Sequence, residues 1–219
     1  MLGVFGRILP KLEGMRTRIV CTCPFVRDLI LLQVILPYFV NKRNILILYS
    51  EALYRKFIRF IDSILMSTPE LESMIDRINV VKIGKNPNCK FGNLFAFIEQ
   101  GNPKDEAYEL TKILTELEND DVLIMHSSMG FFFELLGDAS IREILEIFSI
   151  LPDDITLIGF KSSEGSVDVM INELYDIILK IRRDTMIDDT NFTISMETSG
   201  NVIREFGRFR IKDGAILEL

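Results

Sequence analysis

Asn44-Ile-Leu-Ile-Leu-Tyr49 is the stretch of sequence that decides the fold. Its apolar residues follow one another without polar alternation, which is typical of a strand covered on both faces of a sheet. Apolar residues then recur at helical spacing, at Leu53, Phe57, Phe60, Ile61, Ile64 and Leu65. A buried strand followed by an amphipathic helix predicts one repeat of an α/β fold.

The same alternation continues outward from this repeat in both directions. Further strands are predicted at residues 17–23, 79–83, 122–126 and 154–160. Helices are predicted at residues 25–40, 103–118 and 141–151, and Thr68-Pro69 is typical of a helix start. Elements in this order form right-handed βαβ units. We therefore expect a three-layer fold, with a mainly parallel sheet and helices on both of its faces.

The pattern changes after residue 165. Short strands are predicted at residues 174–181, 192–197 and 206–219, with Asp213-Gly214 as a hairpin signal. We expect these strands to be antiparallel and to extend the sheet at its C-terminal edge. No linker, low-complexity tract or repeat interrupts the sequence, which favours a single domain over residues 1–219.

Composition narrows the classes of function. The net charge of −7 and the pI near 4.9 argue against nonspecific nucleic-acid binding, which needs clustered Lys and Arg against phosphates. The longest apolar run, residues 29–40, carries a Gln and a Pro and falls short of the roughly 20 residues that a membrane span needs. The N-terminal residues lack the pattern of a signal peptide, so we expect a cytoplasmic protein.

Metal-ligating residues are scarce in this chain. Cys21, Cys23 and Cys89 are not spaced for zinc, and one His is present to complement them. We interpret the cysteines as buried thiols in a reducing cell, and we expect neither a metal nor a cofactor.

Four segments carry a family resemblance: Arg18-Ile-Val-Cys-Thr22, Ile45-Leu-Ile-Leu-Tyr-Ser-Glu51, Val122-Leu-Ile-Met-His-Ser127 and Phe209-Arg-Ile-Lys-Asp-Gly-Ala-Ile216. In this order they resemble parts of the RecA-like ATPases of the KaiC type. The first resembles the strand before the phosphate loop, the second the strand that presents a catalytic Glu, the third the Walker B strand and the fourth the terminal hairpin. The chain is most similar to degenerate archaeal, mainly thermococcal, members of that superfamily. The resemblance covers residues 15–219 and implies a RecA/KaiC-like domain.

The departures from the family pattern concern its catalytic parts. A phosphate loop needs glycines whose neighbouring N–H groups face the phosphates, a Lys, and a hydroxyl for magnesium. The segment Cys21-Thr-Cys-Pro-Phe-Val-Arg-Asp28 has no Gly, and Arg27 can replace only the charge of the Lys. His126 stands in place of the metal-orienting Asp, and a neutral imidazole is a poor magnesium ligand. Glu51 keeps the position of the water-activating carboxylate, but the comparison implies a domain without a Walker A loop that does not hydrolyse Mg-ATP.

Four residues are candidates for a rearranged ligand site: Arg27, Glu51, His126 and Ser127. They follow strand ends, where α/β folds place ligands. A hydrogen-bonded structural role is the alternative for His126, and Glu51 is either paired with Asp28 or a solvated residue at a helix start. A Ser127–His126 nucleophilic pair is disfavoured, because neighbours on a strand point to opposite faces.

Met129, Phe131, Phe132 and Phe133 form an unusual apolar run after the Walker B-like strand. Aromatic residues and Met anchor protein contacts, so this run is a candidate groove for a peptide or another subunit. The alternative is that it packs over the vacated phosphate site. Residues 94–98, between Asn- and Gly-containing turns, are expected to form an exposed loop near the strand ends.

The sequence thus predicts a non-catalytic RecA/KaiC-like interaction or regulatory module that self-associates or binds a protein segment. RecA-like relatives assemble side by side, so the resemblance also implies a homo-oligomer. The alternative is a nucleotide or small-ligand binding protein that uses the rearranged site. A hydrolase of unrecognised chemistry would require His126 to meet a nucleophile across strands.

Overall fold

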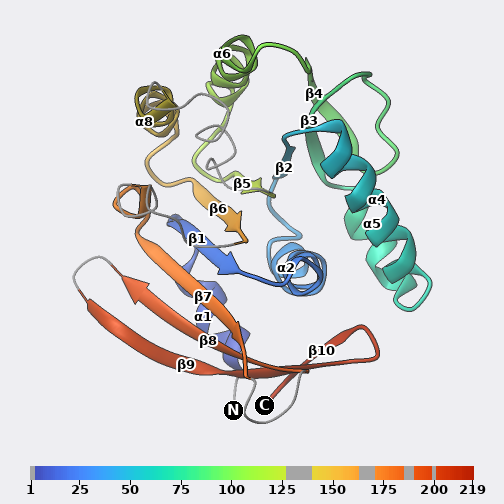
Figure 1. The fold of residues 1–219 in the computed structure, drawn as a ribbon, viewed down its shortest axis with the longest axis vertical. Coiled ribbons are helices and arrows are strands. Elements are labelled where there is room, and N and C mark those ends of the chain that lie inside the picture. Colours follow the sequence, from blue (N-terminus) through green and yellow to red (C-terminus); the bar gives the residue numbers. More distant parts are fainter. Residues whose placement is uncertain (1–2, 127–139, 163–170, 185–189, 199–200) are drawn as a thin grey trace.

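The computed structural model describes residues 3–126, 140–162, 171–184, 190–198 and 201–219 (Figure 1). Ser127, Met129, Phe131, Phe132 and Phe133, which the sequence analysis singled out, lie outside the described residues. The described strands are β1 (Arg16–Cys21), β2 (Asn44–Leu48), β3 (Asn79–Gly84), β4 (Asn93–Glu99), β5 (Val122–Met125), β6 (Thr156–Lys161), β7 (Ile177–Arg183), β8 (Asn191–Thr198), β9 (Asn201–Lys212) and β10 (Ala215–Glu218). They form one ten-stranded sheet in the order β10-β9-β8-β7-β1-β6-β5-β2-β3-β4.

The sheet is mainly parallel, as the sequence predicts. The seven strands from β7 to β4 in this order run parallel to one another. The strands β8, β9 and β10 are antiparallel and form the C-terminal edge, and Asp213-Gly214 makes the predicted turn between β9 and β10. The prediction for residues 174–181 was wrong in direction: β7 pairs in parallel with the central strand β1, and the antiparallel part begins with β8.

Helices cover both faces of the sheet. They are α1 (Val4–Ile8), α2 (Pro24–Ile30), α3 (Leu36–Tyr38), α4 (Glu51–Leu65), α5 (Glu72–Ile75), α6 (Pro103–Leu114) and α8 (Ser140–Ile150). On one face, α1 to α5 share a core with Leu46 and Leu48 of β2; on the other, α6 and α8 pack with Ile45 and Ile47 of the same strand. Figure 1 shows α6 and α8 side by side, and they belong to a different core from α4 and α5. Among the described helices, none is both long and apolar enough to cross a bilayer.

The helix predicted over residues 25–40 is interrupted by a π-helical turn. This turn, Leu31–Ile35, joins α2 to α3. Pro37 lies in the following turn, where it has no N–H to donate and its ring would clash with the carbonyl group four residues earlier. A wider turn before the proline accommodates that carbonyl and keeps the segment helical.

The expectation of an exposed loop at residues 94–98 was wrong. These residues belong to β4, which pairs in parallel with β3 and is the last strand of the sheet on that side. Leu94-Phe-Ala-Phe-Ile98 is a continuous apolar run typical of a strand, and the turn residues on either side bound it. Its position at the edge leaves most of its side chains half-exposed or exposed.

Candidate functional site

The connection between β1 and α2 occupies the place where the family resemblance puts a phosphate loop. β1 ends at Cys21 and α2 begins at Pro24, so two residues separate the strand from the helix. Proline suits the first position of a helix, because its missing N–H would have no intrahelical partner there. The chain therefore enters the helix directly, without a glycine-rich loop to surround a phosphate group.

Arg27, Asp28 and His126 form a buried cluster beside this connection. Asp28 Oδ1 accepts a hydrogen bond from Arg27 Nε at 2.7 Å and lies 2.9 Å from His126 Nε2. The three side chains are 8%, 4% and 2% exposed, in that order. The ring of Phe57, from α4, packs edge-on against the imidazole with centroids 4.8 Å apart. Two sequence candidates, Arg27 and His126, thus meet through a carboxylate inside the protein.

The charge states of this cluster follow from burial and hydrogen bonding. Burial lowers the pKa of His126 below its ordinary value, so the imidazole is neutral at neutral pH. Burial acts to raise the pKa of Asp28, but hydrogen bonds from His126 and Arg27 outweigh it and the pKa lies below its ordinary value. The imidazole then donates its Nε2–H to Asp28, and its Nδ1 has no hydrogen-bond partner among the described residues. The Asp28 carboxylate is thus already engaged by two side chains of the protein itself.

Glu51 lies in a different cluster. It is the first residue of α4, which is capped by Ser50 Oγ accepting from Leu53 N at 3.2 Å. Glu51 Oε1 accepts from Arg55 Nε at 3.0 Å, and Oε2 lies 3.2 Å from Lys82 Nζ. Burial acts to raise the pKa of Glu51, but Arg55 and Lys82 outweigh it and lower the pKa. The backbone N–H of Lys85 also donates to Oε2, at 3.4 Å. Glu51 therefore lies apart from Arg27 and His126, and the candidates from the sequence belong to two separate clusters.

Lys82 is a site residue that the sequence analysis missed. It lies in β3 with its side chain 1% exposed. Its ammonium group donates to Asn86 Oδ1 at 3.3 Å and to Asn88 O at 2.9 Å, and it lies 4.0 Å from the ring centroid of Tyr54. Together with Glu51 these acceptors satisfy all three donors of the ammonium. The sequence does carry a sign of this site: Lys82 is a lysine within an otherwise apolar strand. A charged group buried there needs polar partners nearby, and those partners mark a site.

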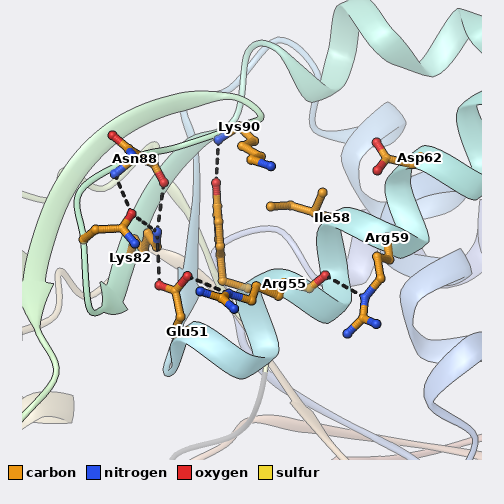
Figure 2. Close-up of a pocket in the computed structure, with 10 residues that line it drawn as sticks. Glu51, Arg55, Ile58, Arg59, Asp62, Lys82, Asn88 and Lys90 are labelled. Carbon is orange, nitrogen blue, oxygen red and sulfur yellow. Dashed lines mark hydrogen bonds and ion pairs between the residues drawn. The ribbon is translucent and has the colours of Figure 1, made fainter.

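A pocket of about 610 Å³ opens beside Glu51 and Lys82. One wall is the exposed side of α4, and the other is the loop that follows β3, as Figure 2 shows. The labelled lining residues are Glu51, Arg55, Ile58, Arg59, Asp62, Lys82, Asn88 and Lys90. An adjoining depression shares Glu51, Arg55 and Arg59 and adds Lys85. We call the pocket and this depression together the α4 groove.

Two solved structures resemble this chain along almost its whole length. One is the Pyrococcus horikoshii OT3 protein PH0250, with a TM-score of 0.58 and 15% identity over 99% of this chain and 98% of that chain. The other is the KaiC-like protein PH0186 from the same hyperthermophilic archaeon, with a TM-score of 0.56 and 12% identity over 94% of this chain and 90% of that chain. No protein-family model and no curated protein matches the sequence.

The order and direction of the strands are those of a RecA-like α/β fold. Within that class, the fold of this chain is KaiC-like, as the family resemblance predicted. At identities this low the likeness extends to the fold alone, so function has to be argued from the residues of the site.

Proposed function

We propose that this protein is a KaiC-like module that does not hydrolyse Mg-ATP and that acts through contacts with other proteins. The observation that carries the proposal is the Arg27–Asp28–His126 cluster. A KaiC-type ATPase would need a phosphate cradle and a metal-orienting carboxylate at these strand ends. Here the carboxylate of Asp28 is bonded to Arg27 and lies next to His126.

The residues at these strand ends are also poorly suited to holding magnesium. His126, at the end of β5, is a neutral and buried imidazole, whereas magnesium prefers oxygen ligands. Glu51 is engaged by Arg55 and Lys82, so it is not placed as a free general base. A rearranged ligand site at Arg27 and His126 receives less support, because both side chains are buried and bonded to Asp28.

The partner of such a module is argued from the fold and the sequence. RecA-like domains assemble side by side, so we propose self-association or capture of a protein segment. Met129 and Phe131 to Phe133 are the residues whose chemistry suits an anchor.

Phosphate release from Mg-ATP and the molar mass in solution test the two parts of this proposal together. We expect release at the rate of a protein-free control, and light scattering that gives a multiple of the 25.2 kDa chain mass. Turnover that is lost in Glu51→Gln would overturn the first part, because it would assign catalysis to this carboxylate. A monomer that also fails to bind protein segments displayed in a peptide library would overturn the second.

A further inference from the structure

The α4 groove carries a concentration of positive charge. Five basic side chains line it: Arg55, Arg59, Lys82, Lys85 and Lys90. Two carboxylates, Glu51 and Asp62, oppose them, which leaves a surplus of three positive charges in a chain whose net charge is −7. A concave surface of one charge sign focuses the field and attracts ions of the opposite sign.

The basic side chains divide into a fixed base and an open rim. Lys82 is buried and fully bonded to Glu51, Asn86 and Asn88, so it holds the floor in place. Arg59 and Lys90 are exposed, and neither forms an ion pair with a described residue. In Figure 2 they extend from opposite walls, Arg59 from α4 and Lys90 from the loop after β3. Arg59 Nε donates to the carbonyl oxygen of Arg55 at 3.4 Å, so its two terminal nitrogens and the ammonium group of Lys90 are the donors that the rim offers to a ligand.

We propose that the α4 groove binds the phosphate groups of a small phosphorylated metabolite. The guanidinium groups of Arg55 and Arg59 are planar forks that match phosphate oxygens in pairs. Asn86 adds a neutral donor: its Oδ1 accepts from Lys82 and from Asn88 N, so its amide nitrogen is the group that remains for a ligand. Ile58 supplies apolar contact for the rest of the molecule.

Size and charge favour a small ligand over a nucleic acid. A volume of about 610 Å³ lies within the usual range of small-molecule pockets. A nucleic acid follows an extended stripe of basic residues, and the net charge of −7 would repel its phosphates outside the groove.

This site is separate from the cluster on which the proposed function rests. The groove is built by α4 and the loop after β3, whereas the cluster is built by α2 and the residue after β5. The groove could thus bind a phosphorylated molecule whether or not the protein hydrolyses ATP.

Titration calorimetry with inorganic pyrophosphate, in buffer with EDTA and without magnesium, tests the proposal. We expect one site on the wild-type protein and at least a tenfold weaker affinity in Arg59→Glu/Lys90→Glu. The matched control is Arg77→Glu/Lys104→Glu, which changes the net charge equally at two exposed residues outside the groove. This control is expected to bind as the wild type does. Arg59→Gln/Lys90→Gln provides a second groove variant with a smaller change of charge, and circular dichroism checks that each variant is folded.

Three results would overturn the site. The first is no binding of pyrophosphate to the wild-type protein. The second is equal weakening in the groove and control variants, which would assign the effect to the overall charge. The third is that a single-stranded oligonucleotide binds the wild-type protein more tightly than pyrophosphate does, and that the groove variant loses this binding. That result would identify the ligand of the groove as a nucleic acid and not a metabolite. None of these results involves magnesium or turnover, so they are distinguishable from failure of the proposed function.

Discussion

Arg27, His126 and Glu51 would share one nucleotide site in a KaiC-type ATPase, but here they lie in two separate clusters. Arg27 and His126 meet at Asp28, whereas Glu51 turns to Arg55 and Lys82. The first grouping follows from the parallel strands β1 and β5, which lie on either side of β6 and whose carboxyl ends lie at one edge of the sheet. The second depends on a lysine inside an apolar strand, and no local pattern indicates which carboxylate such a lysine will meet.

The buried imidazole predicts an acid-sensitive stability. His126 is the single histidine of the chain, and burial lowers its pKa from an ordinary 6.5. Its contribution to stability is therefore present above pH 6.5 and is lost as the pH falls, because the unfolded chain binds the proton and the native state does not. Between pH 7.5 and pH 5.5 we expect the free energy of unfolding to fall by up to about 1.4 kcal/mol for this group. Urea denaturation at a series of pH values measures the slope.

His126→Gln provides the control for that slope. The amide keeps a donor for Asp28 but does not titrate, so the free energy of unfolding should change less over the same pH interval. Parallel pH dependences of the two proteins would show that the imidazole is not the group responsible.

At the scale of elements, hydrophobic pattern predicted most of the sheet and failed at its edges. The strands β1, β2, β3, β5 and β6 lie where largely apolar runs predicted them, because each is buried on both faces. β4 was missed because turn residues surround it and an edge strand exposes its side chains. The direction of β7 was missed because a strand's own residues do not say which neighbour it pairs with.

The connection between β3 and β4 depends on a backbone that only glycine adopts readily. Gly92 has a φ of +63°, and a Cβ at this position would lie 2.4 Å from the carbonyl oxygen of Ile78. We expect Gly92→Ala to lower the free energy of unfolding by about 2 kcal/mol or more, through strain and steric overlap. At Gly101 a Cβ would meet nothing within 4 Å. Gly101→Ala should therefore change stability by less than about 0.5 kcal/mol, and equal effects in urea denaturation would refute the argument.

Across the whole molecule, the two ends of the chain lie together on the antiparallel part of the sheet. Phe5 of α1 packs against Phe209 of β9 with ring centroids 5.3 Å apart, and Arg7 Nη2 donates to Phe206 O at 3.0 Å. Figure 1 shows α1 next to this part of the sheet, and its contacts are with β9. The N-terminal helix therefore covers strands that are far from it in sequence, which secondary-structure patterns alone do not predict.

The closeness of this contact is set by Gly207. A Cβ there would lie 2.8 Å from Val4 Cγ2 and 3.0 Å from Val4 Cβ, so any larger residue pushes α1 away from β9. We expect Gly207→Ala to cost about 1–3 kcal/mol by overpacking, and Val4→Ala to cost a similar amount by leaving a cavity. In the double variant the new methyl group occupies part of the space that valine vacates, so the loss should fall short of the sum by about 1 kcal/mol. Urea denaturation of the wild type, the two single variants and the double variant gives this coupling.

The control pair is Val4→Ala and Gly101→Ala, which share no contact, so their losses of stability should add. If the losses at Val4 and Gly207 also added, α1 would not pack against β9 in solution.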